Sequence, residues 1–188
     1  MKTCISIVTS FLLCTAAFSG KVFPQQNSQE YTHVVISPTA GLPGQEISLP
    51  IYLEAAPGVE VGSIALDLVF PDQQISFVTV QGSLVSEMVG AEITAVLRAD
   101  LEDESKSVLE VALSTLETGS QQAIPDGLLG FVTVHLAEDA QLDTQIVLSS
   151  QGSAMTTGAP PRPVDPLTVH DGVISVGEAI FACFFYMH

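Results

Sequence analysis

Apolar and polar residues alternate with a period of two along several stretches of the chain between residues 34 and 176. Because successive side chains of a β-strand point to opposite faces, this alternation predicts strands with one face in a core and the other in water. The positions expected to face the core in the three clearest segments are Ile47, Leu49, Ile51 and Leu53, then Ile64, Leu66, Leu68 and Phe70, and then Leu109, Val111 and Leu113.

Further strands are predicted from short apolar runs that Gly, Pro or Asp residues interrupt. They cover residues 34–37, 75–80, 92–98, 128–136, 145–149 and 172–176. Helical periodicity is absent from most of the chain, and only residues 83–89 carry a weak signal for one helical turn. About nine strands at this spacing are typical of a single all-β sandwich or jelly roll.

Three local features predict details of this sandwich. Pro50 lacks the N–H that a strand ladder uses, so its strand is expected at a sheet edge or beside a bulge. Residues 128–136 are nearly all apolar, which favours a central strand covered on both faces. Residues 151–166 hold four Pro and two Gly, so we expect a long irregular loop there.

The two ends of the chain differ from its middle. Lys2, an apolar stretch over residues 5–17 and the small residues at Ala17 and Ser19 predict a signal peptide over residues 1–19, which would direct the protein outside the cell or to the cell envelope. A polar leader over residues 20–33, a sandwich over 34–176 and an apolar tail over 177–188 follow. The tail is about half the length that spans a bilayer, and its contact with a membrane or with the sandwich stays open.

Composition narrows the range of partners. The chain has 21 acidic against 5 basic residues and a net charge of −16, which disfavours nucleic acid and anionic lipid as partners. Of its 3 cysteines, only Cys183 would remain after removal of the signal peptide, so no intrachain disulfide is expected. The core must therefore hold the domain together.

Few residues suggest catalysis, a cofactor or a metal. The acidic residues between 100 and 104 lack the Gly and the spacing of a calcium-binding EF-hand loop, so we interpret them as a solvated loop. His33, His135 and His170 are dispersed and are interpreted as ordinary strand residues. No nucleotide-binding or hydrolase motif occurs, so the sequence predicts no enzyme and no cofactor.

Several short motifs, in their order along the chain, resemble those of a cohesin module. They are Pro-Gly-x-x-Ile-x-Leu-Pro-Ile at 43–51, the alternating strand with its Phe-Pro turn at 64–71, Asp-Gly-x-Leu-Gly-x-Val-x-Val at 126–134 and Asp-Gly-Val-Ile-x-Val at 171–176. The resemblance implies a secreted, non-catalytic, nine-stranded jelly roll of the superfamily that includes cellulose-binding modules. It also implies a calcium-loaded dockerin helix pair as partner, docked on a flat sheet face, and a link to extracellular polysaccharide degradation.

The resemblance places the partner-binding residues on the outward face of the segment from 61 to 70. These are Ser63, Ala65, Asp67 and Val69. Cellulosomal cohesins usually present polar residues there, often Asn or Asp, and in this chain only Asp67 and Ser63 could serve. Two other functions stay open. One is a carbohydrate-binding module on the same fold, for which the chain offers no Trp and only Tyr31, Tyr52 and Tyr186; the other is a structural or adhesive envelope protein.

Overall fold

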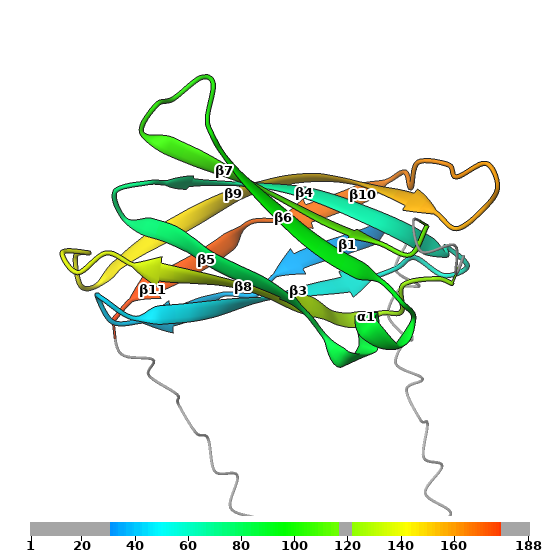
Figure 1. The fold of residues 1–188 in the computed structure, drawn as a ribbon, viewed down its shortest axis with the longest axis horizontal. Coiled ribbons are helices and arrows are strands. Elements are labelled where there is room, and N and C mark those ends of the chain that lie inside the picture. Colours follow the sequence, from blue (N-terminus) through cyan, green and yellow to red (C-terminus); the bar gives the residue numbers. More distant parts are fainter. Residues whose placement is uncertain (1–30, 117–121, 178–188) are drawn as a thin grey trace, which may run out of the picture.

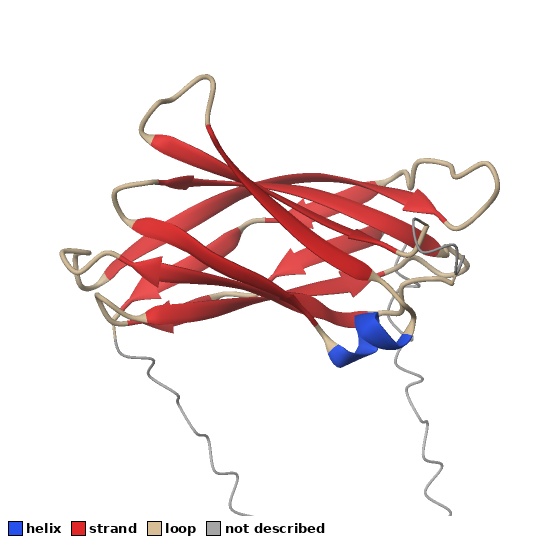
Figure 2. Ribbon diagram, in the orientation of Figure 1, coloured by secondary structure: helices blue, strands red, loops and turns tan. Residues whose placement is uncertain are grey.

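The computed structural model describes residues 31–116 and 122–177, which form two β-sheets packed face to face (Figures 1 and 2). The five-stranded sheet contains, in spatial order, β10 (Leu167–His170), β1 (Thr32–Ile36), β3 (Glu46–Glu54), β8 (Gly127–Leu136) and β5 (Ile75–Gly82). The six-stranded sheet contains, in spatial order, β2 (Thr39–Gly41), β11 (Gly172–Val176), β9 (Thr144–Thr156), β4 (Val61–Pro71), β7 (Lys106–Ser114) and β6 (Glu92–Ala99). The predicted all-β sandwich is therefore confirmed.

The described residues form eleven strands, where the pattern led us to expect about nine. The two additional strands are β2, with three residues, and β10, with four. Strands this short carry too few alternating positions to stand out in a sequence. Both take part in parallel pairs between an early and a late strand of the chain. β1 pairs with β10 in one sheet, and β2 pairs with β11 in the other.

The core lies between the sheets and includes all the residues that the alternation predicted. Leu49 and Leu53 on β3, Leu68 on β4 and Leu109 on β7 retain at most 1% of their exposed surface. Burying an aliphatic side chain of this size contributes about 1.5–3 kcal/mol. Because the described strands supply more than twenty such residues, the core can stabilise the sandwich without cross-links.

Pro50 lies in an internal strand beside a shift in register, so of the two expected alternatives, a sheet edge or a bulge, the bulge is the one present. β3 runs between β1 and β8, and its register with β8 shifts between Ile51 and Tyr52. The carbonyl of Pro50 accepts a hydrogen bond of 2.9 Å from the amide of Ser37, just after β1 ends. In an antiparallel pair the nitrogen and oxygen of one residue face the same neighbour. The missing N–H of Pro50 therefore faces the end of β1, where little of the ladder is lost.

Strand β8 is internal, as predicted, but only one of its faces is covered. Val132, Val134 and Leu136 are buried in the core, whereas Phe131 and Thr133 are half-exposed on the outer side. The expectation of cover on both faces is wrong. Thr133 and His135 alternate with the buried Val132, Val134 and Leu136, so the polar residues lie on the outer face. The outer face of the five-stranded sheet is open to solvent at this strand.

Strand β9 extends to Thr156, so residues 151–156 form a strand where an irregular loop was expected. Gly152 does not break the strand. A Cβ atom there would lie 2.7 Å from the carbonyl oxygen of Ala65 on the neighbouring strand, so the glycine permits a close approach of two backbones. The prolines of the predicted loop follow, in residues 157–166, which lead into β10.

The weak helical signal corresponds to α1 (Leu84–Met88), which lies at one end of the sandwich (Figure 2). Ser83 is its N-cap, and its hydroxyl accepts a hydrogen bond of 3.1 Å from the amide of Ser86. The hydroxyls of Ser83 and Ser86 also donate to the carbonyls of Leu128 and Leu129, at 2.6 and 2.9 Å. The two buried serines thus attach the helix to the start of β8.

Strand β1 begins at Thr32, inside the segment predicted as a leader. The predicted signal peptide, most of the leader, the apolar tail from residue 178 and Cys183 lie outside the described residues. Within the described residues no helix is long and apolar enough to cross a membrane.

Candidate functional site on the six-stranded sheet

The four predicted binding residues lie together on the outer side of β4, in the interior of the six-stranded sheet. Ala65 is exposed, and Ser63, Asp67 and Val69 are half-exposed. The alternate residues of β4 are buried in the core, as the period of two requires. Because β4 is flanked by β7 on one side and β9 on the other, its outer residues lie within a broad sheet surface.

The register of the four neighbouring strands defines this surface, which we name the β4 face. Each row across it takes one residue from β6, β7, β4 and β9. The four rows are Glu92–Ser114–Ser63–Met155, Thr94–Ala112–Ala65–Ser153, Val96–Glu110–Asp67–Gln151 and Arg98–Val108–Val69–Ser149.

Small side chains form the middle of the β4 face. Ala112, Ala65 and Ser153 occupy one row and are all exposed. Since none of these side chains extends far from the sheet, a partner can approach the backbone closely along this row. The face is therefore a flat surface and not a pocket.

A charged cluster spans the next two rows. The Nε atom of Arg98 on β6 donates to Oε1 of Glu110 on β7 at 2.5 Å, and its NH2 group lies 3.6 Å from Oδ2 of Asp67 on β4. The hydrogen bond with Glu110 is the main reason that the pKa of Arg98 is raised. The side chains of Arg98 and Asp67 keep 41% and 49% of their exposure, so the cluster remains accessible to a partner.

Sequence reasoning identified Asp67 but missed Arg98 and Glu110. Alternation alone indicates that both point outward from their strands, but it does not reveal that β6 and β7 lie next to β4. Val96, an apolar residue in the row of Glu110 and Asp67, was missed for the same reason. Its side chain retains 59% of its exposed surface. The site thus combines small, charged and apolar residues from several strands.

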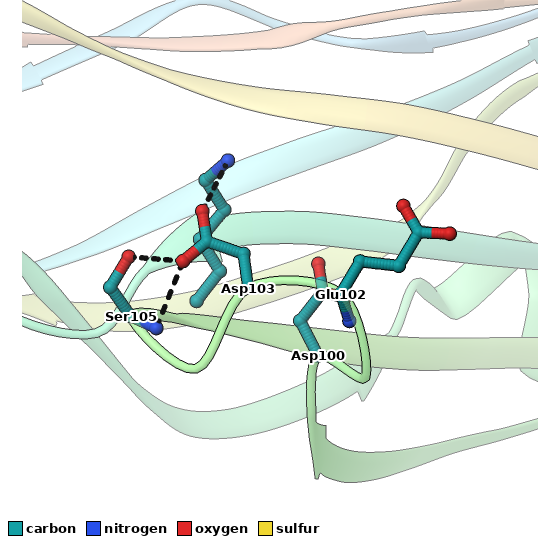
Figure 3. Close-up of polar contacts among 5 residues, drawn as sticks. Asp100, Glu102, Asp103 and Ser105 are labelled. Carbon is teal, nitrogen blue, oxygen red and sulfur yellow. Dashed lines mark hydrogen bonds and ion pairs between the residues drawn. The ribbon is translucent and has the colours of Figure 1, made fainter.

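Residues 100–105, of which four are acidic, form the turn between β6 and β7 (Figure 3). Oδ1 of Asp103 accepts hydrogen bonds from the hydroxyl and the amide of Ser105, at 2.6 and 3.1 Å, and its Oδ2 lies 3.0 Å from Nζ of Lys106. The Ser105 hydroxyl, followed by Lys106, lowers the pKa of Asp103 to about 2. Asp100 accepts a bond of 2.9 Å from the amide of Glu102. Two of the carboxylates therefore shape the turn itself.

The other candidate residues lie elsewhere. Tyr52 is half-exposed on β3 of the five-stranded sheet, Tyr31 directly precedes β1, and Tyr186 lies outside the described residues. Histidines that seemed dispersed in the sequence are partly brought together, because His33 on β1 and His170 on β10 are in hydrogen-bond contact. His135 is on β8, which β3 separates from β1.

No protein-family model and no curated protein sequence matches the chain. The structure is similar to the third cohesin of ScaC from Acetivibrio cellulolyticus, which was solved in complex with the ScaB dockerin. That similarity has a TM-score of 0.63 and 14% identity, and covers 78% of this chain and 99% of the cohesin.

Two cohesins from other organisms give similar values. The seventh ScaB type I cohesin of Pseudobacteroides cellulosolvens matches with a TM-score of 0.61 and 16% identity, over 84% of this chain and 98% of that one. A non-cellulosomal cohesin of the archaeon Archaeoglobus fulgidus matches with a TM-score of 0.56 and 17% identity, over 84% of this chain and 99% of that one. Nearly the whole of each cohesin is matched by the sandwich described above. The chain therefore has the fold of a cohesin domain.

Proposed function

We propose that this protein is a secreted, non-catalytic protein-binding module of cohesin type, which recognises a dockerin-like partner through the β4 face. The observation that carries the proposal is the structural similarity to cohesins, including one solved with its dockerin, over nearly their whole length. The predicted signal peptide supports secretion. A role in extracellular polysaccharide degradation is part of the same proposal, because the resemblance to cellulosomal cohesins implies it.

The β4 face has the physical properties that a protein partner requires. A standard interface buries about 800 Å² on each partner, usually with a less polar centre and a polar rim. On this face, Ala65 and Ala112 allow close contact, Val96 offers exposed apolar surface, and Asp67 with Arg98 offers charges for orientation.

The charge of the chain adds a constraint on the partner. A net charge of −16 speeds association with a surface that is basic or that carries bound cations. A calcium-loaded dockerin-like module would meet this condition through its own bound ions. The calcium in this proposal thus belongs to the partner.

The alternative function, direct binding of polysaccharide, is favoured by a different part of the molecule. A cleft of about 260 Å³ lies between the β4–β5 turn and the β8–β9 connection, and its lining includes Gln73, Gln74, Gln141 and Gln145. Side-chain amides both donate and accept hydrogen bonds, as sugar hydroxyls do.

The proposal is tested by affinity capture from the secreted fraction of the source organism, with and without a calcium chelator. Three forms of the protein are compared: wild type, Ala65→Arg in the middle of the β4 face, and Ser76→Arg on β5 of the opposite sheet. Both substituted residues are exposed, so each arginine can be accommodated in solvent.

We expect wild type and Ser76→Arg to retain a partner with paired calcium-binding repeats, in a calcium-dependent manner, and Ala65→Arg to lose it. Loss in Ser76→Arg alone would place the binding surface on the other sheet. Adhesion to insoluble polysaccharide without any retained protein would support the carbohydrate-binding alternative.

A further inference from the structure

His33 and His170 lie side by side on adjacent strands of the five-stranded sheet, although 137 residues separate them in the sequence. Nδ1 of His33 and Nε2 of His170 are 3.0 Å apart, and the two rings are stacked with centroids 5.3 Å apart and an interplanar angle of 25°. In the parallel register His33 is opposite Thr168 and His170 is opposite Val35, so the two histidines are diagonal neighbours on one face.

The separation of these nitrogen atoms matches that of two ligands on one metal ion. Bonds from a metal to imidazole nitrogen are about 2.0–2.1 Å long, so two adjacent ligands at bond angles of about 90–110° lie about 2.9–3.4 Å apart. The observed 3.0 Å falls in this range. We propose that Nδ1 of His33 and Nε2 of His170 form a binding site for a divalent transition-metal ion, with water as the remaining ligands.

The chemistry of the ligands selects the class of ion. Imidazole nitrogen suits copper, nickel and zinc, whereas calcium and magnesium prefer oxygen ligands. For a site made only of imidazole and water, affinity is expected to be highest for Cu²⁺, with Ni²⁺ and Zn²⁺ weaker. The site is thus distinct in its chemistry from the calcium attributed above to a dockerin-like partner.

The hydrogen bond between the rings determines what happens to the proton on binding. One of the two facing nitrogens carries a hydrogen and the other accepts it. When a metal ion binds, that hydrogen must move to the other nitrogen of its own ring, so both rings stay neutral and both facing nitrogens donate a lone pair.

Carboxylates near the pair favour a cation there. Glu54 on β3 is opposite His33 in the antiparallel register, and Asp171 follows His170 directly and accepts a hydrogen bond of 2.7 Å from the amide of Ser150. Thr168 and Val35, the register partners of the two histidines, are uncharged. The charged residues around the site therefore add attraction for a divalent ion.

A bound ion would link an edge strand to the rest of the sheet. β10 is at the end of the five-stranded sheet, with β1 as its neighbour there. A ligand that binds only the folded state, present at a free concentration of about 100 times its Kd, raises the folding equilibrium constant about 100-fold. Metal binding should therefore raise the melting temperature and slow the opening of β10.

The test is calorimetric titration of the full chain, without a polyhistidine tag, with NiCl₂ and with CuCl₂ at pH 7.5. The variants are His33→Gln and His170→Gln, and His135→Gln on β8 is the matched control. All forms carry His188→Gln, which removes the remaining histidine of the chain. Melting temperatures without metal establish that each variant folds.

We expect one high-affinity site in the parent and in His135→Gln, with a rise in melting temperature on metal addition. Affinity should fall at least about 10-fold in His33→Gln and in His170→Gln. Loss of a residue that hydrogen-bonds to a metal ligand typically weakens binding about 10–100-fold, and loss of the ligand itself should weaken it at least as much. Equal binding in the parent and in either of these two variants, or no binding to the parent, would overturn the proposal. Neither outcome depends on whether a dockerin-like partner binds the β4 face.

Discussion

Asp67 and Glu110 are directly opposite each other on β4 and β7, and the guanidinium of Arg98 on β6 contacts both carboxylates. Like charges in opposing positions of a sheet destabilise it, so Arg98 offsets a repulsion within the β4 face. The cluster is therefore a structural element of three strands as well as a candidate contact for a partner.

Replacement of Arg98 by Gln should lower stability at low ionic strength, because the Asp67 and Glu110 carboxylates then repel each other without compensation. The effect should shrink at high salt, since exposed charges are screened. Urea denaturation at two salt concentrations measures it. Arg162→Gln, at an exposed arginine between β9 and β10, is the control, and an equal response of both variants would show that only net charge matters.

The turn between β6 and β7 should show a pH dependence that originates at Asp103. Its pKa is about 2, below the usual value near 3.8, so the charged form is favoured in the folded protein. A carboxyl whose pKa is lower in the folded state than in the unfolded state stabilises the fold at any pH above the unfolded-state pKa. That contribution is lost as the pH falls towards the folded-state pKa. Wild type should therefore exceed Asp103→Asn in stability at pH 7, and the difference should disappear between about pH 4 and pH 2.

Solvent screening keeps the Asp103 contribution small, so a direct titration of its carboxyl carbon by NMR is the sharper measurement. Glu104→Gln serves as the control for the loss of one charge from the same turn. A titration of Asp103 near its usual value would contradict the hydrogen-bonding pattern of Figure 3.

Gly152→Ala should destabilise the protein by about 1–3 kcal/mol, in the range of other overpacking substitutions. The added Cβ would lie 2.7 Å from the carbonyl oxygen of Ala65 and from Cδ2 of Leu66, and the backbone of β4 cannot move without disturbing its pairing with β7. Thermal denaturation measures the loss. Ser153→Ala, at the next and exposed position, should stay within about 0.5 kcal/mol of wild type.

Ser83→Ala should cost about 1–2 kcal/mol, because it removes the N-cap of α1 and a buried hydrogen bond to Leu128. The amide of Ser86 and the carbonyl of Leu128 would both lose a partner. Ser76→Ala, at an exposed serine on β5, provides a comparison in which little change is expected. Equal stabilities of the two variants would mean that water replaces the Ser83 hydroxyl at no cost.

The sequence predicted nine of the eleven described strands, and the inward faces of the three clearest, but not which strands are neighbours. The burial of Leu49 and Leu109 follows from local alternation, which every strand of the sandwich has to satisfy. The Arg98 cluster depends on the order β4–β7–β6, and the contact of His33 with His170 depends on a pairing across most of the chain. Such pairings are tertiary properties, so residues that seemed unrelated in the sequence could form one site.

Local patterns were also less informative at glycine and proline, because these residues occur both in turns and inside strands. Gly152 was interpreted as part of a loop, whereas in the structure it permits two strands to approach closely. Pro50 was expected at an edge or beside a bulge; the bulge is present, and the end of β1 beside Pro50 makes an internal position tolerable. In both cases the neighbouring strand, and not the residue itself, determined the outcome.

The parallel pairings of β1 with β10 and of β2 with β11 have a consequence for the order of folding. The first strands of the sandwich obtain these partners only when the last described strands have been synthesised. A nascent chain that ends before Leu167 therefore leaves one edge of β1 unpaired and β2 without its hydrogen-bonded neighbour. Pairings of such long sequence separation are slow to form, so β1 and β2 should obtain their parallel partners late in folding.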